Sequence, residues 1–150
     1  MGHDELIAVC FTLWKAMGFG HAPDAPVIAN AIVTSAEDNP IDSMDVLRTV
    51  EVMAEWAGEE SGVQLSPKPY ISKKTGRPID SEAHGFLQLH GNCGLLDPTT
   101  QGRCWLVLAH WGQVNCPESP LAPLSGSCTK ARKLAERRIA KAFRLAETVQ

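Results

Sequence analysis

The segment that ends at Glu60 constrains the fold most strongly, because apolar residues recur along it with a helical period. Four apolar residues before it are spaced four, three and four positions apart: Val46, Val50, Met53 and Ala57. This spacing aligns their side chains along one face of a helix. Glu60 follows Ala57 by three positions and continues the same stripe. We therefore expect an amphipathic helix with a carboxylate at the end of its apolar face.

The other charged residues of this segment fall on a different face. They are spaced three, four and four positions apart: Arg48, Glu51, Glu55 and Glu59. This face is expected in water, whereas Glu60 is expected at the rim of the core or in a cleft. Desolvation raises the pKa of a carboxyl group, which suits a general acid. The alternative interpretation is that Glu60 caps the helix end or pairs with a basic residue.

Most of the remaining chain also shows helical periodicity, which predicts a mainly α protein. Helices are expected within residues 4–36, in the apolar segment WLVLAHW (105–111), and over residues 128–149. The last of these is amphipathic and basic, since seven of the 14 lysines and arginines lie between Lys130 and Arg144. A chain of 150 residues is most simply one domain, here residues 1–150.

The loops and the charge narrow the range of functions. Residues 62–82 are rich in Pro, Gly, Ser and Lys and are expected to form a long loop, of the kind that is usually functional or mobile. A net charge of -3 argues against nucleic acid as a partner. The basic C-terminal helix is interpreted as a solvated face, or as a surface for an anionic polymer or a partner protein.

The N-terminal segment does not resemble an export signal. Asp4 and Glu5 stand where a basic region is expected, and Lys15 breaks the apolar run. That run is also too short to span a bilayer. We therefore expect a protein that is made in the cytoplasm without an export signal and that has no membrane span.

The cysteine pattern does not indicate a metal site. The five cysteines, an odd number without a CxxC pair, are Cys10, Cys93, Cys104, Cys116 and Cys128. His84 and His90 lie near Cys93, but their spacing fits no common zinc pattern. No metal or other cofactor is expected. The thiols are expected to be buried, with one or two disulfides if the protein functions outside the cytoplasm.

Four short motifs occur in order along the chain: EESG (59–62), AHGFLQL (83–89), DP (97–98) and LAPLSGS (121–127). Together they resemble lytic transglycosylases of the lysozyme-like superfamily. In that family a Glu-Ser pair ends a helix, a Gly-Leu-Met-Gln segment follows, Asp-Pro starts a later helix, and a Tyr-Asn-x-Gly motif comes near the end. The segment GFLQLHGNCG is also similar to plant-type chitinases, whose fold is related.

The resemblance implies a lysozyme-like helical domain with a small β-hairpin region around residues 63–90 and a motif-bearing core over about residues 44–127. It implies that Glu60 is the single catalytic acid and base. The residues that it places at the substrate, by their positions in the motifs, are Ser61, Ala83, Gly85, Phe86, Gln88, Ser125 and Gly126.

The implied reaction cleaves the bond between N-acetylmuramic acid and N-acetylglucosamine in peptidoglycan, with closure of an anhydro ring. A lysozyme-type muramidase or a chitinase-like hydrolase would use water and a second carboxylate, for which Asp80 and Glu82 are the candidates. Leu124 and Ser125 replace the usual Tyr and Asn, which favours a third alternative, a non-catalytic glycan-binding or virion structural module. Small size and the missing export signal suit a phage product that acts on the cell wall, with glycan strands and virion proteins as partners.

Overall fold

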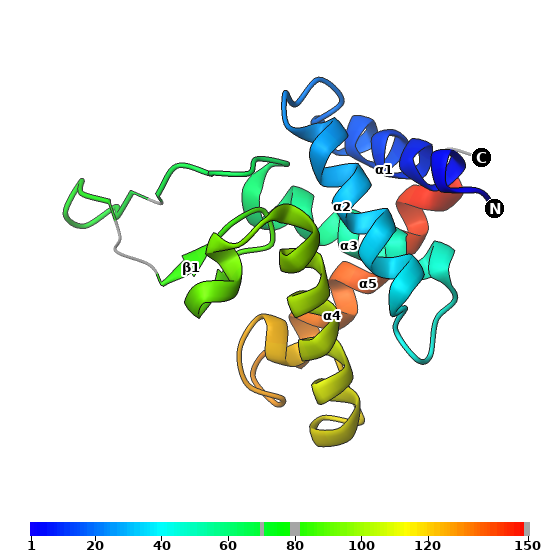
Figure 1. The fold of residues 1–150 in the computed structure, drawn as a ribbon. Coiled ribbons are helices and arrows are strands. Elements are labelled where there is room, and N and C mark those ends of the chain that lie inside the picture. The colour runs from blue at the N-terminus through cyan, green and yellow to red at the C-terminus, as the bar shows by residue number, and fades with distance from the viewer. Residues whose placement is uncertain (70, 79–81, 149–150) are drawn as a thin grey trace.

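The computed structural model describes residues 1–69, 71–78 and 82–148 and confirms that the protein is mainly helical (Figure 1). In chain order, the helices and strands are α1 (His3–Met17), α2 (Ala25–Asp38), α3 (Val46–Ser61), β1 (Ala83–His84), β2 (Leu89–His90), the 3-10 helix η1 (Gly91–Leu95), α4 (Pro98–Asn115), the 3-10 helix η2 (Ala122–Leu124) and α5 (Arg132–Thr148). The strands β1 and β2 form an antiparallel pair, within the region where a small hairpin was expected.

Helix α3 lies at the centre of the molecule and packs against α1, α2 and α5. Asp45 begins this helix, because its carboxylate accepts a hydrogen bond from the backbone N–H of Arg48 at 2.8 Å. Gly62 ends it in the left-handed conformation. The expected helix is therefore present, with Asp45 as its N-cap.

Three tryptophans fasten the neighbouring helices to α3. The indole N–H of Trp14 in α1 donates to the backbone carbonyl of Ala54 at 2.8 Å. Trp56 meets Trp105 of α4 edge to face, with ring centroids 5.8 Å apart. All three indoles are fully buried. These contacts fix the direction in which the end of α3 points.

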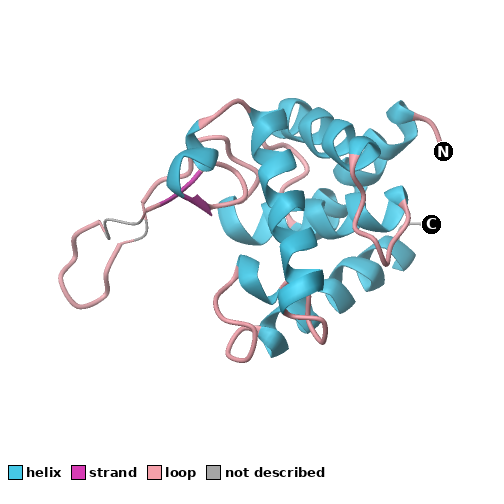
Figure 2. Ribbon diagram, turned by 60° about the horizontal axis from the view of Figure 1, so that its bottom comes forward, coloured by secondary structure: helices cyan, strands magenta, loops and turns pink. Residues whose placement is uncertain are grey.

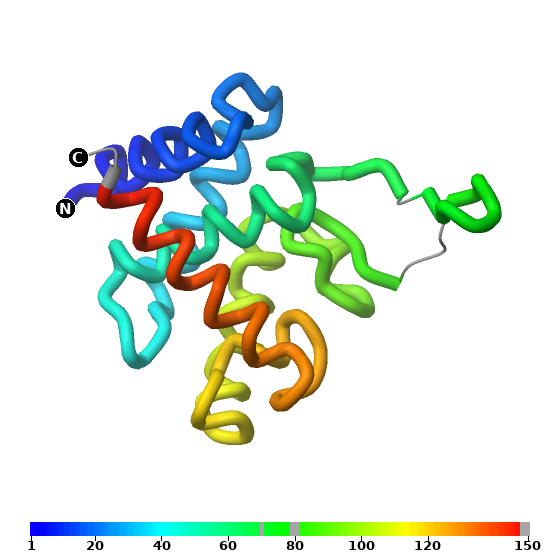
Figure 3. Tube along the Cα trace, turned by 180° about the vertical axis from the view of Figure 1, so that it is seen from behind, coloured from blue at the N-terminus to red at the C-terminus, as the bar shows by residue number. Residues whose placement is uncertain are grey.

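Most of the charged face of α3 is not in water, and the prediction was wrong for two of its glutamates. Glu51 is 1% exposed and Glu55 is 0% exposed. The reason is that α5 runs across α3 and covers them, as the rear view shows (Figure 3). Periodicity identifies the face of a helix but not the element that packs on it. Glu59 is exposed, as expected, and pairs with Lys141 of α5.

Two further helices differ in detail from the sequence. The WLVLAHW segment is helical but only partly buried: Trp105 is buried, whereas Val107 is 63% and Trp111 is 51% exposed. Helix α5 begins at Arg132 rather than at residue 128, after a turn in which the backbone N–H of Lys130 donates to the hydroxyl of Ser127.

Four of the five cysteines form disulfides. Cys93 of η1 pairs with Cys104 of α4, and Cys116 pairs with Cys128. Cys10 is a buried free thiol. The first bond ties a short irregular segment to a long helix and so restrains η1. None of the helices in the described part of the chain is long and apolar enough to cross a bilayer.

Two helical glycines allow a direct test of the packing. A Cβ atom at Gly112 would overlap the backbone oxygen of Pro120, whereas at Gly58 it would meet the flexible end of Met17. We expect Gly112→Ala to lower the free energy of unfolding by about 1–3 kcal/mol. Gly58→Ala, the matched control, should cost less, because alanine favours a helix by about 1 kcal/mol over glycine. Urea denaturation of both variants measures this difference, and equal losses would contradict the packing of α4 described above.

Candidate functional site

A cleft of about 810 Å³ opens at the C-terminal end of α3. One side is formed by the segment that follows α3, which leaves the helical body before the chain returns at β1 (Figure 2). The other side is formed by the β1–β2 turn, η1 and the first turn of α4. The residues that line it are Glu60, Leu65, Ser66, Pro67, Lys68, Pro69, Pro78, Ala83, His84, Gly85, Gln88, Gly94, Leu95, Leu96, Pro98 and Gln101.

Glu60 is the one carboxylate that lines this cleft among the described residues. Its side chain is 23% exposed, as expected for a group at the rim of the core. One of its oxygens accepts a hydrogen bond from Nη1 of Arg138 in α5 at 2.5 Å. The guanidinium of Arg138 also lies over the ring of Trp56, 4.7 Å from its centroid. Glu60 therefore lies between the cleft and the guanidinium of Arg138.

Gly85 is the second site residue that the structure explains in detail. It adopts φ +80°, which favours glycine, and a Cβ atom there would overlap Oε1 of Gln101 and the backbone oxygen of Gly94. A side chain at this position would therefore push apart the turn, η1 and α4. The glycine permits the close approach of three segments that form one wall of the cleft.

Gln88 and Ser61 stabilise the backbone around the site. The amide of Gln88 donates to the carbonyl of Gly85 at 2.9 Å, which uses one of its two N–H donors. The hydroxyl of Ser61 donates to the carbonyl of Ala57 at 2.9 Å and accepts from the backbone N–H of Gln64. Gln88 lines the cleft, whereas Ser61 is buried and closes the last turn of α3.

Of the remaining predicted site residues that the structure describes, only Ala83 lines the cleft. Phe86 belongs to the hydrophobic core and is fully buried. Ser125 and Gly126 follow η2 and are not among the lining residues. Asp80 falls outside the described residues, and Glu82 is exposed and does not line the cleft.

Gln101 lines the cleft, although sequence reasoning did not place it there. Its amide N–H donates to the carbonyl of Leu96 at 2.7 Å, while its Oε1 is buried without a hydrogen-bond partner among the described residues. An unpartnered amide oxygen at a cleft wall can accept a hydrogen bond from a ligand. The sequence feature that could have indicated this role is the position of Gln101 in the first turn after Asp97-Pro98.

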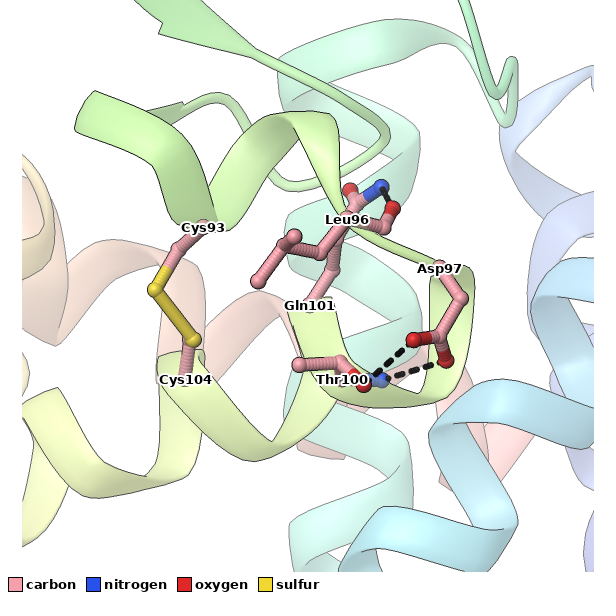
Figure 4. The surroundings of a disulfide bond; sticks show 6 residues. All are labelled: Cys93, Leu96, Asp97, Thr100, Gln101 and Cys104. Carbon is pink, nitrogen blue, oxygen red and sulfur yellow. Dashed lines mark hydrogen bonds between the residues drawn. A yellow bond between two sulfur atoms is a disulfide. The ribbon is translucent and has the colours of Figure 1, made fainter.

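The wall that carries Gln101 is braced by local bonds (Figure 4). Asp97 caps α4, since its carboxylate accepts from the backbone N–H and the hydroxyl of Thr100. These bonds lower the pKa of Asp97. Near this cap, the Cys93–Cys104 disulfide holds η1 against α4. The sulfur of Cys93 is therefore not a free metal ligand. No group of three His, Cys, Asp or Glu in the described chain could hold a metal ion.

An apolar groove of about 570 Å³ adjoins the cleft and shares Gln88 with it. Its floor contains the Cys93–Cys104 disulfide, and the exposed side chains of Val107 and Trp111 form one edge. Leu124, which stands in place of the family's tyrosine, also lines this groove. The fourth motif therefore faces the groove rather than the cleft.

The most perturbed carboxyl group lies behind the site, at the contact between α3 and α5. Burial raises the pKa of Glu55 to about 7, although Arg138 and Lys141 act to lower it. Neither oxygen of Glu55 has a hydrogen-bond partner among the described residues, and the closest cation, Nζ of Lys141, is 3.9 Å away. Burial likewise raises the pKa of Glu51, which is paired with Arg48 at 3.3 Å.

Comparison of the chain with protein-family models, with curated proteins and with solved structures finds no significant match in any of the three. The geometry of the cleft and the chemistry of its residues therefore carry the functional argument.

The buried carboxyl of Glu55 makes a testable contribution to stability. A folded-state pKa of about 7, against 4.5 for an ordinary glutamate, stabilises the fold fully below pH 4.5, and this contribution is lost as the pH rises through 7. Between about pH 4 and about pH 8 the loss corresponds to about 3 kcal/mol. Glu55→Gln removes the ionisation, so its stability relative to wild type should rise by about that amount across this range.

Urea denaturation at several pH values measures this effect. Glu136→Gln, at an exposed position of α5, is the control and should show no comparable pH-dependent gain. A constant difference between Glu55→Gln and wild type at every pH would show that Glu55 titrates normally.

Proposed function

We propose that the protein is a peptidoglycan lytic transglycosylase with a lysozyme-like fold, in which Glu60 is the catalytic acid and base. The observation that carries the proposal is the meeting of Glu60 with Ala83, Gly85 and Gln88 around one cleft, although more than 20 positions separate Glu60 from the other three in the chain. Residues from three of the four motifs that suggested the family therefore lie together in space at a solvent-accessible cavity. A glycan strand requires an open groove of this kind, since its chain extends beyond the reacting bond.

In the proposed reaction, Glu60 first donates a proton to the glycosidic oxygen between N-acetylmuramic acid and N-acetylglucosamine. Its carboxylate then takes the proton of the muramoyl C6 hydroxyl. The C6 oxygen attacks the anomeric carbon, and an anhydro ring replaces the broken bond. Every proton and electron pair is accounted for without a water molecule or a second carboxylate. Among the described residues that line the cleft, Glu60 is the one carboxylate. This supports ring closure over hydrolysis, because hydrolysis would use a second carboxylate.

The walls of the cleft supply groups that suit an N-acetylated sugar. The unpartnered oxygen of Gln101 can accept an amide N–H, and the second N–H of Gln88 can donate to an acetamide carbonyl. Leu95 and Leu96 expose apolar surface at the same wall. Lys68, on the opposite side, provides a cation for the carboxylates of a peptidoglycan peptide stem.

A second candidate function is a non-catalytic module that binds glycan or a virion protein. The pair between Glu60 and Arg138 favours it, because a carboxylate in a hydrogen-bonded ion pair can be purely structural. The replacement of the family's Tyr and Asn by Leu124 and Ser125 points the same way. In both cases the partner is the cell wall or a virion, reached by a protein made in an infected host.

Replacement of the proposed acid separates the two functions. Glu60→Gln should lower the rate of turbidity loss of purified bacterial walls by at least about 100-fold, because a general acid contributes 100- to 10,000-fold. Glu136→Gln, which removes an exposed carboxylate of α5, should leave the rate unchanged. Lysis by Glu60→Gln at the wild-type rate would remove Glu60 from the mechanism. Wall binding without lysis by the wild-type protein would establish the non-catalytic module.

Mass spectrometry of the released muropeptides identifies the reaction. Anhydro-muramic ends are expected for a transglycosylase. Reducing muramic ends would instead show a muramidase that uses water, and the second carboxylate would then have to come from residues that do not line the cleft described above.

A further inference from the structure

The contact between α3 and α5 contains more acid than base. Three glutamates of α3 face two cations of α5: Glu55, Glu59 and Glu60 on one side, Arg138 and Lys141 on the other. These are also the charges that act on Glu55. If all five groups were ionised, this partly buried cluster would carry an uncompensated negative charge. Burying an unpaired charge is costly, so the cluster is most stable with one proton bound.

The hydrogen bonds within the cluster indicate which glutamate holds that proton in this arrangement. Arg138 is hydrogen-bonded to Glu60, and Lys141 is bonded to Glu59. Glu55 is then left in the core with two unpartnered oxygens, which is the environment of a neutral carboxylic acid. The raised pKa of Glu55 agrees with this distribution.

In this arrangement Glu60 is poorly prepared for the proposed reaction. A general acid delivers its proton from one of its oxygens, and Oε1 of Glu60 is occupied by the guanidinium. The charge of Arg138 also acts on Glu55, because it opposes the effect of burial on the pKa of that carboxyl. The guanidinium lies over the ring of Trp56, which is adjacent to Glu55 in sequence and four positions before Glu60.

We propose that Glu55 and Glu60 share one proton and that Arg138 is the positioning residue that decides which of them holds it. When the guanidinium is on Glu60, the proton is on Glu55, in keeping with the two unpartnered oxygens of that buried carboxyl. When the guanidinium moves to Glu55, that carboxyl releases its proton to solvent and Glu60 takes one up from the cleft. The number of bound protons is the same in both states, and only the second state presents an acid to the substrate. The catalytic part of this inference depends on the function proposed above.

The proposal predicts opposite shifts for two variants in the pH dependence of wall lysis. Glu55→Gln removes the alternative partner of Arg138, which then stays on Glu60; the alkaline limb should move down by at least about one pH unit. Arg138→Gln removes the cation that competes with the proton, so the limb should move up by about one unit. If both variants lower the rate without moving the limb, the two residues have structural roles only.

The double variant is the decisive comparison. Glu55→Gln impairs Glu60 through Arg138, so Glu55→Gln/Arg138→Gln should recover most of the lysis that Glu55→Gln loses at pH 7, by about 10-fold or more. Simple addition of two losses would overturn the proposal. Unfolding measurements on the same proteins exclude a trivial cause, because Glu55→Gln is expected to be the more stable protein at that pH.

A second measurement does not depend on activity. Carbon-13 NMR of the glutamate carboxyl groups should show Glu55 titrating at about pH 7 in the folded wild-type protein, and this titration should move in Glu60→Gln if the two carboxyls are coupled. Coupled titration without any wall lysis would disprove the enzymatic function and leave the shared proton established. Lysis accompanied by independent titrations would disprove the shared proton and leave the enzymatic function intact.

Discussion

The packing of α5 across the acidic face of α3 is the interaction on which the rest of the structure depends. The sequence pattern predicts that this face is solvated, but the contact buries most of it. Several of its glutamates must therefore pair with cations or remain protonated. Arg48, Arg138 and Lys141 satisfy most of that requirement. The basic character of the C-terminal helix is therefore explained within the fold in part, since some of its cations neutralise α3 rather than meet a partner.

The position of α3 in this contact also places its C-terminal end at the cleft. Helix α3 ends where the long segment toward β1 begins, and its last turn carries Glu60 to the surface while the preceding turns remain in the core. Opposite it, η1 and the start of α4 form a wall held by the Cys93–Cys104 disulfide and by the cap at Asp97. A carboxylate at a helix end thus lies at one cleft with the side-chain amides of Gln88 and Gln101.

The pair between Arg138 and Glu60 fits both interpretations of Glu60 that the sequence offered: a catalytic carboxylate, or a carboxylate that pairs with a basic residue. A structural ion pair and a catalytic carboxylate look alike when only the pair is considered. The additional fact is that Glu55, directly behind the pair, has no hydrogen-bond partner among the described residues and keeps a raised pKa. This buried carboxyl is the second partner that the proposed exchange of Arg138 requires.

Periodicity was sufficient to predict the helical class, the end of α3 near Glu60 and the position of Glu60 at the rim of the core, because these are local properties of the chain. The resemblance to a known family placed Gly85 and Gln88 in one motif, and both line the cleft. Local rules could not show that Glu51 and Glu55 are buried, that Arg138 reaches Glu60 across 78 positions, or that Gln101 turns toward the cleft. Those features are decided by which helix packs on which face, a choice that depends on the free energy of burying the whole core and that no single segment encodes.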